Sequence, residues 1–263
     1  METSAGLRID HVVILVNDLQ AASADYTALG FTVTPGGEHA DGLTHNALIC
    51  FADGSYLELI AFKGRAPESH FFYRGEGYEG LVTFALLPDD INRVISSARQ
   101  RSLDLQGPIP GGRLRPDGTR IEWQTARPPS RDLPFLCADV TPRELRVPSG
   151  LGTQHANGIL GIDSITVQVR DLRASTERYS ALLGAGPRTP DANNTVANTA
   201  AFALDTISII LTEPLDELDR ADLEKFGEGP QSLTLRAPGG TPTDYLDPDL
   251  SHGVRFEVVG RNS

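Results

Sequence analysis

Cysteine is scarce in this chain, and long apolar runs are absent. Its 263 residues include only two cysteines, Cys50 and Cys137, and both lie in apolar stretches that are typical of strands. This favours buried free thiols and excludes a disulfide framework. No apolar run approaches the roughly 20 residues of a membrane-spanning helix, and residues 1–4 (METS) lack the charged and apolar regions of a signal peptide. We therefore expect a soluble, cytoplasmic protein without a membrane partner.

Positive charge is also in short supply. Lys and Arg total 23 against 35 Asp and Glu, so the formal net charge is -12. A general nucleic-acid or anionic-membrane surface needs basic patches, and this balance excludes both classes. The 40% of hydrophobic residues are enough for one large or two medium cores.

One stretch of the sequence occurs twice. Residues 9–19 (IDHVVILVNDL) read as a buried strand that runs into a helix N-cap, and residues 162–172 (IDSITVQVRDL) repeat the pattern with the same spacing. A repeated opening strand indicates a chain built from repeated modules. One difference matters for chemistry, because His11 in the first copy is replaced by Ser164 in the second.

The first half of the chain predicts two modules in the order β-α-β-β-β. The first spans residues 9–62, and the second begins with a strand over 81–87 and a helix over 88–101. The hairpin at 118–122 (GTRIE) aligns with the hairpin at 54–58 (GSYLE). This alignment matches Glu122 with Glu58. Val82 matches His11, because each lies seven residues before the Asp that begins the following helix.

The second half predicts a third module and an abbreviated fourth. Residues 133–140 form a further expected strand, and the proline-containing segment 141–158 is the expected linker. The chain then divides into a first domain over 1–140 and a second, degenerate domain over 159–263. In this alignment Ser164 and Ile209 take the places of His11 and Glu58. We expect the second domain to be structural or to act as a lid.

Four such repeats resemble the vicinal oxygen chelate superfamily, which includes glyoxalase I, extradiol dioxygenases, and fosfomycin and bleomycin resistance proteins. The stretches that resemble its glyoxalase-like domain subfamily are 9–13 (IDHVV), 46–49 (NALI), 115–118 (RPDG) and 155–158 (HANG). The resemblance implies an α+β fold in which βαβββ modules form two cupped mixed β-sheets with helices outside. It also implies a divalent metal in the cup, whereas reaction type varies widely on one fold.

The resemblance carries metal-ligand positions over to this chain. In the first domain they fall on His11, Glu58, Glu122 and Val82, so three of them keep a ligand type. In the second domain they fall on Ser164, Ile209, Thr234 and Glu257, and one carboxylate alone holds a divalent ion poorly. A set of one imidazole and two carboxylates suits Mn, Fe, Ni, Zn or Mg better than copper.

Burial supports the first site independently of the resemblance. His11 and Glu58 lie in apolar strands, where a charged or polar side chain needs a partner, and a metal ion is one such partner. The alternative is a histidine hydrogen-bonded directly to the carboxylate. For Glu122 the alternative is a surface ion pair with Arg120, two residues away on the same strand face.

Several other residues are candidates for substrate binding. Asn46 could bind a substrate or hold a turn. Arg115 and Arg120, with Arg113, surround the turn at 116–118, where they could grip a carboxylate or merely balance charge. The run at 70–73 (HFFY) is either a lid over the pocket or packing between modules.

Three functions remain open. The first is a metal-dependent lyase or isomerase of glyoxalase type on a small oxygenated or carbonyl substrate chelated through vicinal oxygens, with Glu58 or Glu122 moving a proton. The second is an extradiol-type Fe(II) dioxygenase, which expects two histidines and one carboxylate, so only His39 or His45 could complete its set. The third is a metal-free protein that sequesters a small molecule. We favour the first, with the cup completed within the chain or across a homodimer.

Overall fold

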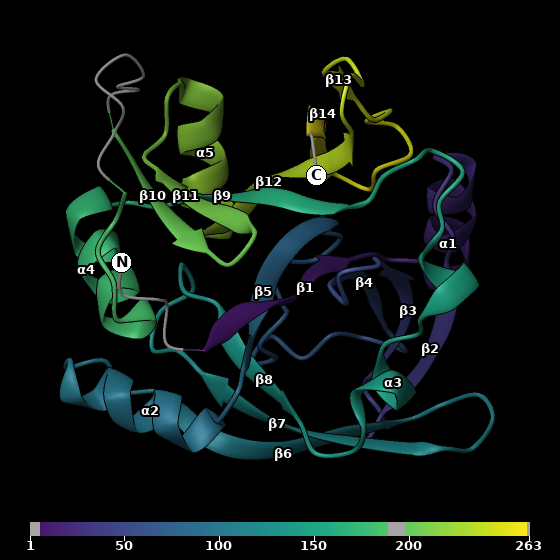
Figure 1. Cartoon of the computed structure of the whole chain (residues 1–263), viewed down its shortest axis with the longest axis horizontal. Coiled ribbons are helices and arrows are strands. Elements are labelled where there is room, and N and C mark those ends of the chain that lie inside the picture. Colours follow the sequence, from purple (N-terminus) through teal and green to yellow (C-terminus); the bar gives the residue numbers. More distant parts are fainter. Residues whose placement is uncertain (1–5, 189–197, 262–263) are drawn as a thin grey trace.

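The first two modules close into one eight-stranded barrel, the lower part of the view in Figure 1. The computed structural model describes residues 6–188 and 198–261. The elements of the two modules are β1 (Leu7–Leu15), α1 (Leu19–Ala28), β2 (Thr34–His39), β3 (Thr44–Cys50), β4 (Tyr56–Phe62), β5 (Gly80–Pro88), α2 (Ile91–Gln100), β6 (Gln106–Leu114), β7 (Arg120–Arg127) and β8 (Phe135–Asp139). Around the barrel the strands follow the order β1-β4-β3-β2-β6-β7-β8-β5.

The rest of the chain forms a six-stranded mixed sheet, which lies above the barrel in Figure 1. A short helix α3 (Arg143–Arg146) and a 3-10 turn η1 (Gly150–Thr153) connect the two parts. The later elements are β9 (Gly161–Gln168), α4 (Leu172–Leu183), β10 (Thr199–Leu204), β11 (Ile207–Thr212), α5 (Glu217–Phe226), β12 (Gly229–Pro238), β13 (Asp244–Tyr245) and β14 (Arg255–Arg261). The strand order is β10-β11-β9-β12-β14-β13. The predicted α+β fold with two mixed sheets is confirmed.

The strand and N-cap repeat found in the sequence forms the same local structure twice. The Asp18 carboxylate caps α1 by accepting hydrogen bonds from the backbone N–H groups of Gln20 and Ala21. The Asp171 carboxylate caps α4 by accepting from the N–H of Ala174. Each cap satisfies N–H groups that have no partner inside the helix, and so fixes where the helix begins.

The second module contains a strand that the sequence did not predict. Strand β6 has the sequence QGPIPGGRL, in which glycine and proline replace the β-branched residues typical of strands. The last strand of this module is therefore β8, which pairs in parallel with β5 as β4 pairs with β1. Glu122 lies on β7, the third strand, so the alignment that set Glu122 over Glu58 is wrong.

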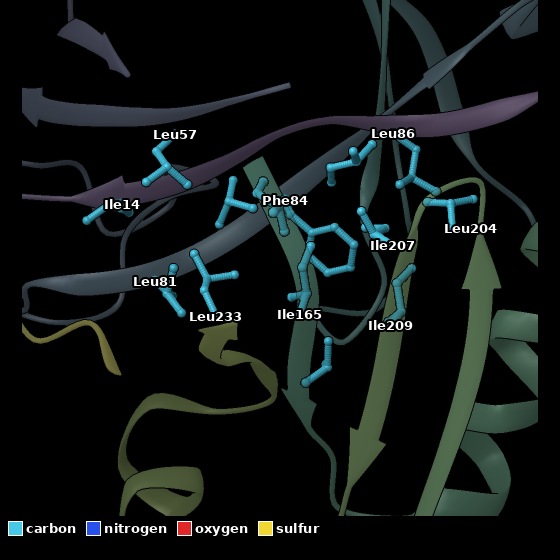
Figure 2. Close-up of a cluster of buried hydrophobic side chains, with 14 of the residues drawn as sticks. Ile14, Leu57, Leu81, Phe84, Leu86, Ile165, Leu204, Ile207, Ile209 and Leu233 are labelled. Atoms are coloured by element: carbon cyan, nitrogen blue, oxygen red, sulfur yellow. The ribbon is translucent and has the colours of Figure 1, made fainter. Parts of the chain in front are cut away.

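The outer face of the barrel packs against one face of the six-stranded sheet. Figure 2 shows Phe84 of β5 among Ile165 of β9 and Ile209 of β11. Apolar side chains form the centre of this junction.

The strand pairing also corrects the alignment of the second half by one residue. Glu58 pairs with Val13, two residues after His11, and Ile210 pairs with Thr166, two residues after Ser164. Ile210, rather than Ile209, therefore takes the place of Glu58.

No helix within 6–188 and 198–261 is long and apolar enough to cross a membrane. Residues 1–4, on which the expectation of no signal peptide rests, lie outside the described residues.

Candidate functional site

A cavity of about 220 Å³ lies inside the barrel. For scale, a dry cavity of about 150 Å³ already holds benzene. Its polar wall comes from His11, His39, Asn46 and Glu58, and its apolar wall is largely aromatic. The aromatic residues are Tyr56, Phe71, Phe72, Trp123 and Phe135. The cavity therefore suits a small molecule that has one polar and one apolar or aromatic side.

His11 and Glu58 face each other at the polar wall. Their strands β1 and β4 are parallel neighbours, and the two side chains are 5% and 6% exposed. The distance from His11 Nε2 to Glu58 Oε2 is 3.4 Å. The ring of Tyr56 stacks on the imidazole, with centroids 4.6 Å apart, and fixes its plane. The structure thus brings together the pair that the sequence singled out.

A β-bulge turns Asp10 toward the same imidazole. The pairing of β1 with β5 shifts register between Ile9 and His11, so Asp10 escapes the strict alternation of faces along a strand. Its Oδ2 lies 2.7 Å from His11 Nδ1. Burial alone would raise the pKa of the Asp10 carboxyl, but the charge of Arg146 and the hydrogen bond from His11 hold that pKa well below its usual value. The ionised Asp10 carboxylate bonds to Nδ1 of the ring, and this leaves Nε2 as the ring nitrogen on the side of Glu58.

Two arginines from α3 neutralise Asp10. Arg146 donates from Nη1 to Oδ2 at 2.8 Å and from Nη2 to Oδ1 at 3.0 Å, and Arg143 donates from Nη1 to Oδ1 at 2.7 Å. Both arginines also bond to Asp139 at the end of β8. Asp10 is fully buried, so its charge requires such partners. These residues lie in the segment expected to be only a linker, and sequence reasoning missed them.

His39 joins the pair from the end of β2. Its Nε2 lies 3.6 Å from Glu58 Oε1, and its Nδ1 lies 2.8 Å from the hydroxyl of Thr44. Burial lowers the pKa of His39 from its usual value, which favours the neutral imidazole that ligates metals. His45, the other loop histidine considered from the sequence, lies on β3 and does not line the cavity.

Asn46 lines the cavity beside Glu58. Its Nδ2 donates a hydrogen bond to Glu58 Oε1 at 2.5 Å and so orients that carboxylate. Within the described residues, Asn46 Oδ1 is buried without a hydrogen-bond partner. An unpaired acceptor beside a cavity is a natural contact for a donor on a ligand.

The structure places the other predicted residues outside the cavity. Glu122 is paired with Arg120 at 2.8 Å, and their side chains are 44% and 70% exposed. Arg115 bonds to Asp117 and to the carbonyl of Leu145. The arginines that do line the cavity are Arg113, Arg127 and Arg146. Side-chain alternation along β7 turns Trp123 and Thr125 inward, and this leaves Glu122 outward.

The donor chemistry at the polar wall suits a divalent metal ion. His11 Nε2, His39 Nε2 and the two Glu58 oxygens are neighbouring nitrogen and oxygen donors. Across the described ranges, no three or more His, Cys, Asp or Glu side chains form a ready-made metal site. The fit therefore rests on the donor types and on the two pairwise approaches to Glu58.

The second sheet carries no comparable set at the equivalent place. Ser164 pairs in register with Thr234, and Thr234 pairs with Glu257. The Thr234 hydroxyl donates to Glu257 Oε2 at 3.3 Å. This row offers two hydroxyls and one carboxylate, and the sheet that carries it is open.

Residues 9–183 match the model of a family described as a glyoxalase-like domain. No curated protein matches the chain. Among solved structures, a hypothetical protein from Staphylococcus aureus is similar, with 14% identity, a TM-score of 0.75, and coverage of 97% of this chain and 100% of that one. A triple mutant of 4-hydroxymandelate synthase from Streptomyces coelicolor has 13% identity, a TM-score of 0.65, and coverage of 99% and 93%.

A fusion protein of a xylose isomerase-like TIM barrel and a 4-hydroxyphenylpyruvate dioxygenase is also similar. It has 13% identity and a TM-score of 0.63, and the match covers 99% of this chain and 50% of that one. At such low identity, these three likenesses establish the fold alone.

Proposed function

Because this chain belongs to the glyoxalase-like domain family, we propose that it is a metal-dependent enzyme that acts on a small oxygen-bearing molecule inside the barrel. The observation that carries the proposal is that His11 Nε2 and Glu58 Oε2 lie 3.4 Å apart inside the cavity. A nitrogen and an oxygen at this separation would be able to bind the same divalent ion. A shared proton would favour a shorter contact, since N–H···O bonds run from about 2.7 to 3.2 Å.

His11, Glu58 and His39 are the residues that would hold the ion. When bound, a divalent metal supplies a Lewis acid that polarises an oxygen of the substrate. The chain's own groups prepare this site: Asp10 holds the tautomer and plane of His11, and Asn46 orients Glu58. Glu58 is also a buried carboxylate that lines the cavity, and it would accept or return a proton.

The aromatic wall suits a substrate with a compact apolar or aromatic body. Phe71 and Phe135 meet edge to face, with centroids 5.8 Å apart, and Trp123 stands edge-on to His39. Together these rings give the cavity a low-polarity side opposite His11 and Glu58, which would strengthen electrostatic interactions with a bound substrate. The oxygens of the substrate would face His11 and Glu58, and its ring or alkyl part would face the aromatic side chains.

Two reaction classes fit this site. A lyase or isomerase of glyoxalase type needs a carboxylate to move a proton, and with Glu122 outside the cavity Glu58 takes that part. The position of His39 favours a second class, an iron-dependent dioxygenase, because two histidines and one carboxylate are the donor set of non-haem Fe(II) oxygenases. One structurally similar protein is named in part a 4-hydroxyphenylpyruvate dioxygenase.

The test is the metal content of the chain purified without chelator or metal-affinity tag. We expect near-stoichiometric divalent metal in the wild type and its loss in His11→Ala, because that substitution removes one nitrogen donor. Iron would favour the dioxygenase class, whereas zinc, nickel, manganese or magnesium would favour the lyase or isomerase class.

Glu122→Gln is the matched control, since it alters a carboxylate that pairs with Arg120 outside the cavity. It should retain the metal. If no variant and no wild-type sample takes up metal after incubation with Mn, Fe, Ni, Zn and Mg, the proposal is wrong and a metal-free sequestering pocket takes its place.

A further inference from the structure

A second cavity, of about 280 Å³, lies between the barrel and the six-stranded sheet. One wall is the segment before β5, which contributes Arg74, Tyr78 and Glu79. The opposite wall comes from the end of β9, the end of α5 and the start of β12. None of its lining residues lines the barrel cavity, so the two spaces are separate.

Arg74 brings an uncompensated positive charge to this cavity. Its Nη2 donates to the carbonyl of Val82, and its Nη1 is buried without a partner in the described part of the chain. Burial and the neighbouring charge of Arg131 lower the pKa of Arg74 to about 10, so the guanidinium stays protonated at neutral pH. A partly buried cation without a carboxylate partner is costly, and an anionic ligand would offset that cost.

Gln168 adds a second unsatisfied donor at the same place. It is the last residue of β9, is 4% exposed, and lines the cavity. Its Nε2 is buried and has no hydrogen-bond partner among the described residues. Buried amide donors are nearly always paired in folded proteins, so an unpaired one beside a cavity indicates a missing acceptor.

The acidic side chains around the cavity already have other partners. Glu79 accepts from the backbone of Asn17 and contacts His252. Glu228 accepts from the backbone N–H of Arg170, at 2.8 Å. Asp222 faces Arg255 at 3.7 Å. These engagements leave the donors of Arg74 and Gln168 as the unmatched groups.

We propose that this cavity binds a small molecule through a carboxylate group, which Arg74 and Gln168 would hold. The planar guanidinium presents parallel N–H groups that match the two oxygens of a carboxylate, and the amide of Gln168 supplies a further donor. The cavity has room for a small organic acid. None of the residues proposed to hold the metal lines it.

The experiment is isothermal titration calorimetry of the full chain with succinate, acetate and inorganic phosphate. We expect saturable binding of a carboxylate probe, weakened about tenfold or more in Arg74→Met and in Gln168→Leu, because each substitution removes a hydrogen bond to a charged carboxylate. Arg74→Lys keeps the charge but loses the planar fork, so it should give an intermediate affinity.

Two controls locate the binding. Arg131→Met removes a nearby positive charge that does not line the cavity, and it should leave the affinity within about threefold of the wild type. His11→Ala should also bind normally, which separates this site from the barrel cavity. Thermal melting checks that each variant is folded, and Arg74→Met should change the midpoint little, since the relief of a buried charge offsets the lost hydrogen bond to the Val82 carbonyl.

Several outcomes would overturn the proposal. These are equal binding in the wild type and Arg74→Met, binding lost in His11→Ala, no saturable binding of either carboxylate, or preference for phosphate over both carboxylates.

Discussion

The barrel and the six-stranded sheet begin from the same strand and helix cap but use them differently. In the barrel, pairing of β2 with β6 joins the two modules at their far edges, His39 opposite Arg113, and encloses a cavity. The second sheet stays open, with β10 and the two-residue strand β13 at its edges. The enclosed half keeps a histidine and a glutamate, and the open half has Ser164 and Ile210 in their places. Among the described residues, the buried pair of histidine and glutamate therefore lies in the half whose sheet closes around a cavity.

The largest expected difference between the two halves concerns metal binding. Glu58→Gln should weaken metal affinity by more than about a hundredfold, because loss of an outer partner alone costs about 10–100-fold and Glu58 is a direct donor. Glu257→Gln, the carboxylate of the open sheet, should leave the affinity unchanged. Competition with a chromogenic chelator measures both, and equal losses in the two variants would abolish the distinction between the halves.

The next difference concerns an ion pair between an arginine and an aspartate in each half. Arg146→Met should lower the free energy of unfolding by about 3 kcal/mol or more, because it leaves the charge of fully buried Asp10 partly uncompensated. Arg261→Met breaks an ion pair with Asp163 in which the arginine is 57% exposed, so it should cost at most about 1 kcal/mol. Urea unfolding followed by circular dichroism measures both. A small cost for Arg146→Met would show that Arg143 alone suffices.

A smaller effect should appear in acid. The pKa of Asp10 is lower in the folded chain than the value of about 3.9 in the unfolded chain. Its contribution to stability is therefore fully present above about pH 4 and is lost as the pH falls through the folded-state pKa. Urea unfolding at about pH 5 and about pH 3 should show this loss in the wild type. The Asp10→Asn variant should be less stable than the wild type at pH 5 but should lose less unfolding free energy between pH 5 and pH 3. Equal losses in the variant and the wild type would contradict the assignment of this effect to Asp10.

Much of the fold and half of the polar wall could be predicted from the sequence. The repeat, the Asp caps and the alternating strands are local patterns, and they place His11 and Glu58 on neighbouring strands. Strand β6 was missed because its glycines and prolines do not favour strands. The missing strand shifted the alignment of the second module by one strand and set Glu122 over Glu58. Pairing with β7 and closure of the barrel, which are tertiary effects, override that local preference.

Other parts of the site have no local signal at all. The bulge that turns Asp10 toward His11 depends on the register with β5, 70 or more residues away in the chain. Arg146 lies in a segment whose sequence predicts only a linker. Its positive charge pairs with the buried carboxylate of Asp10, but nothing in the local sequence of either residue indicates that pairing. His39 could have been found by asking which histidine ends a strand beside β3, but strand β2 (TPGGEH) is itself rich in turn residues.

One short segment touches both cavities. Phe71 and Phe72 line the space inside the barrel, and Arg74, two residues later, lines the space between the sheets. A molecule in either cavity that favours one placement of this segment therefore changes the affinity of the other cavity, and the reverse effect has the same magnitude by thermodynamic reciprocity. A coupling free energy carried by this segment would act across only residues 71–74. It can be measured by titrating one ligand at fixed saturation of the other.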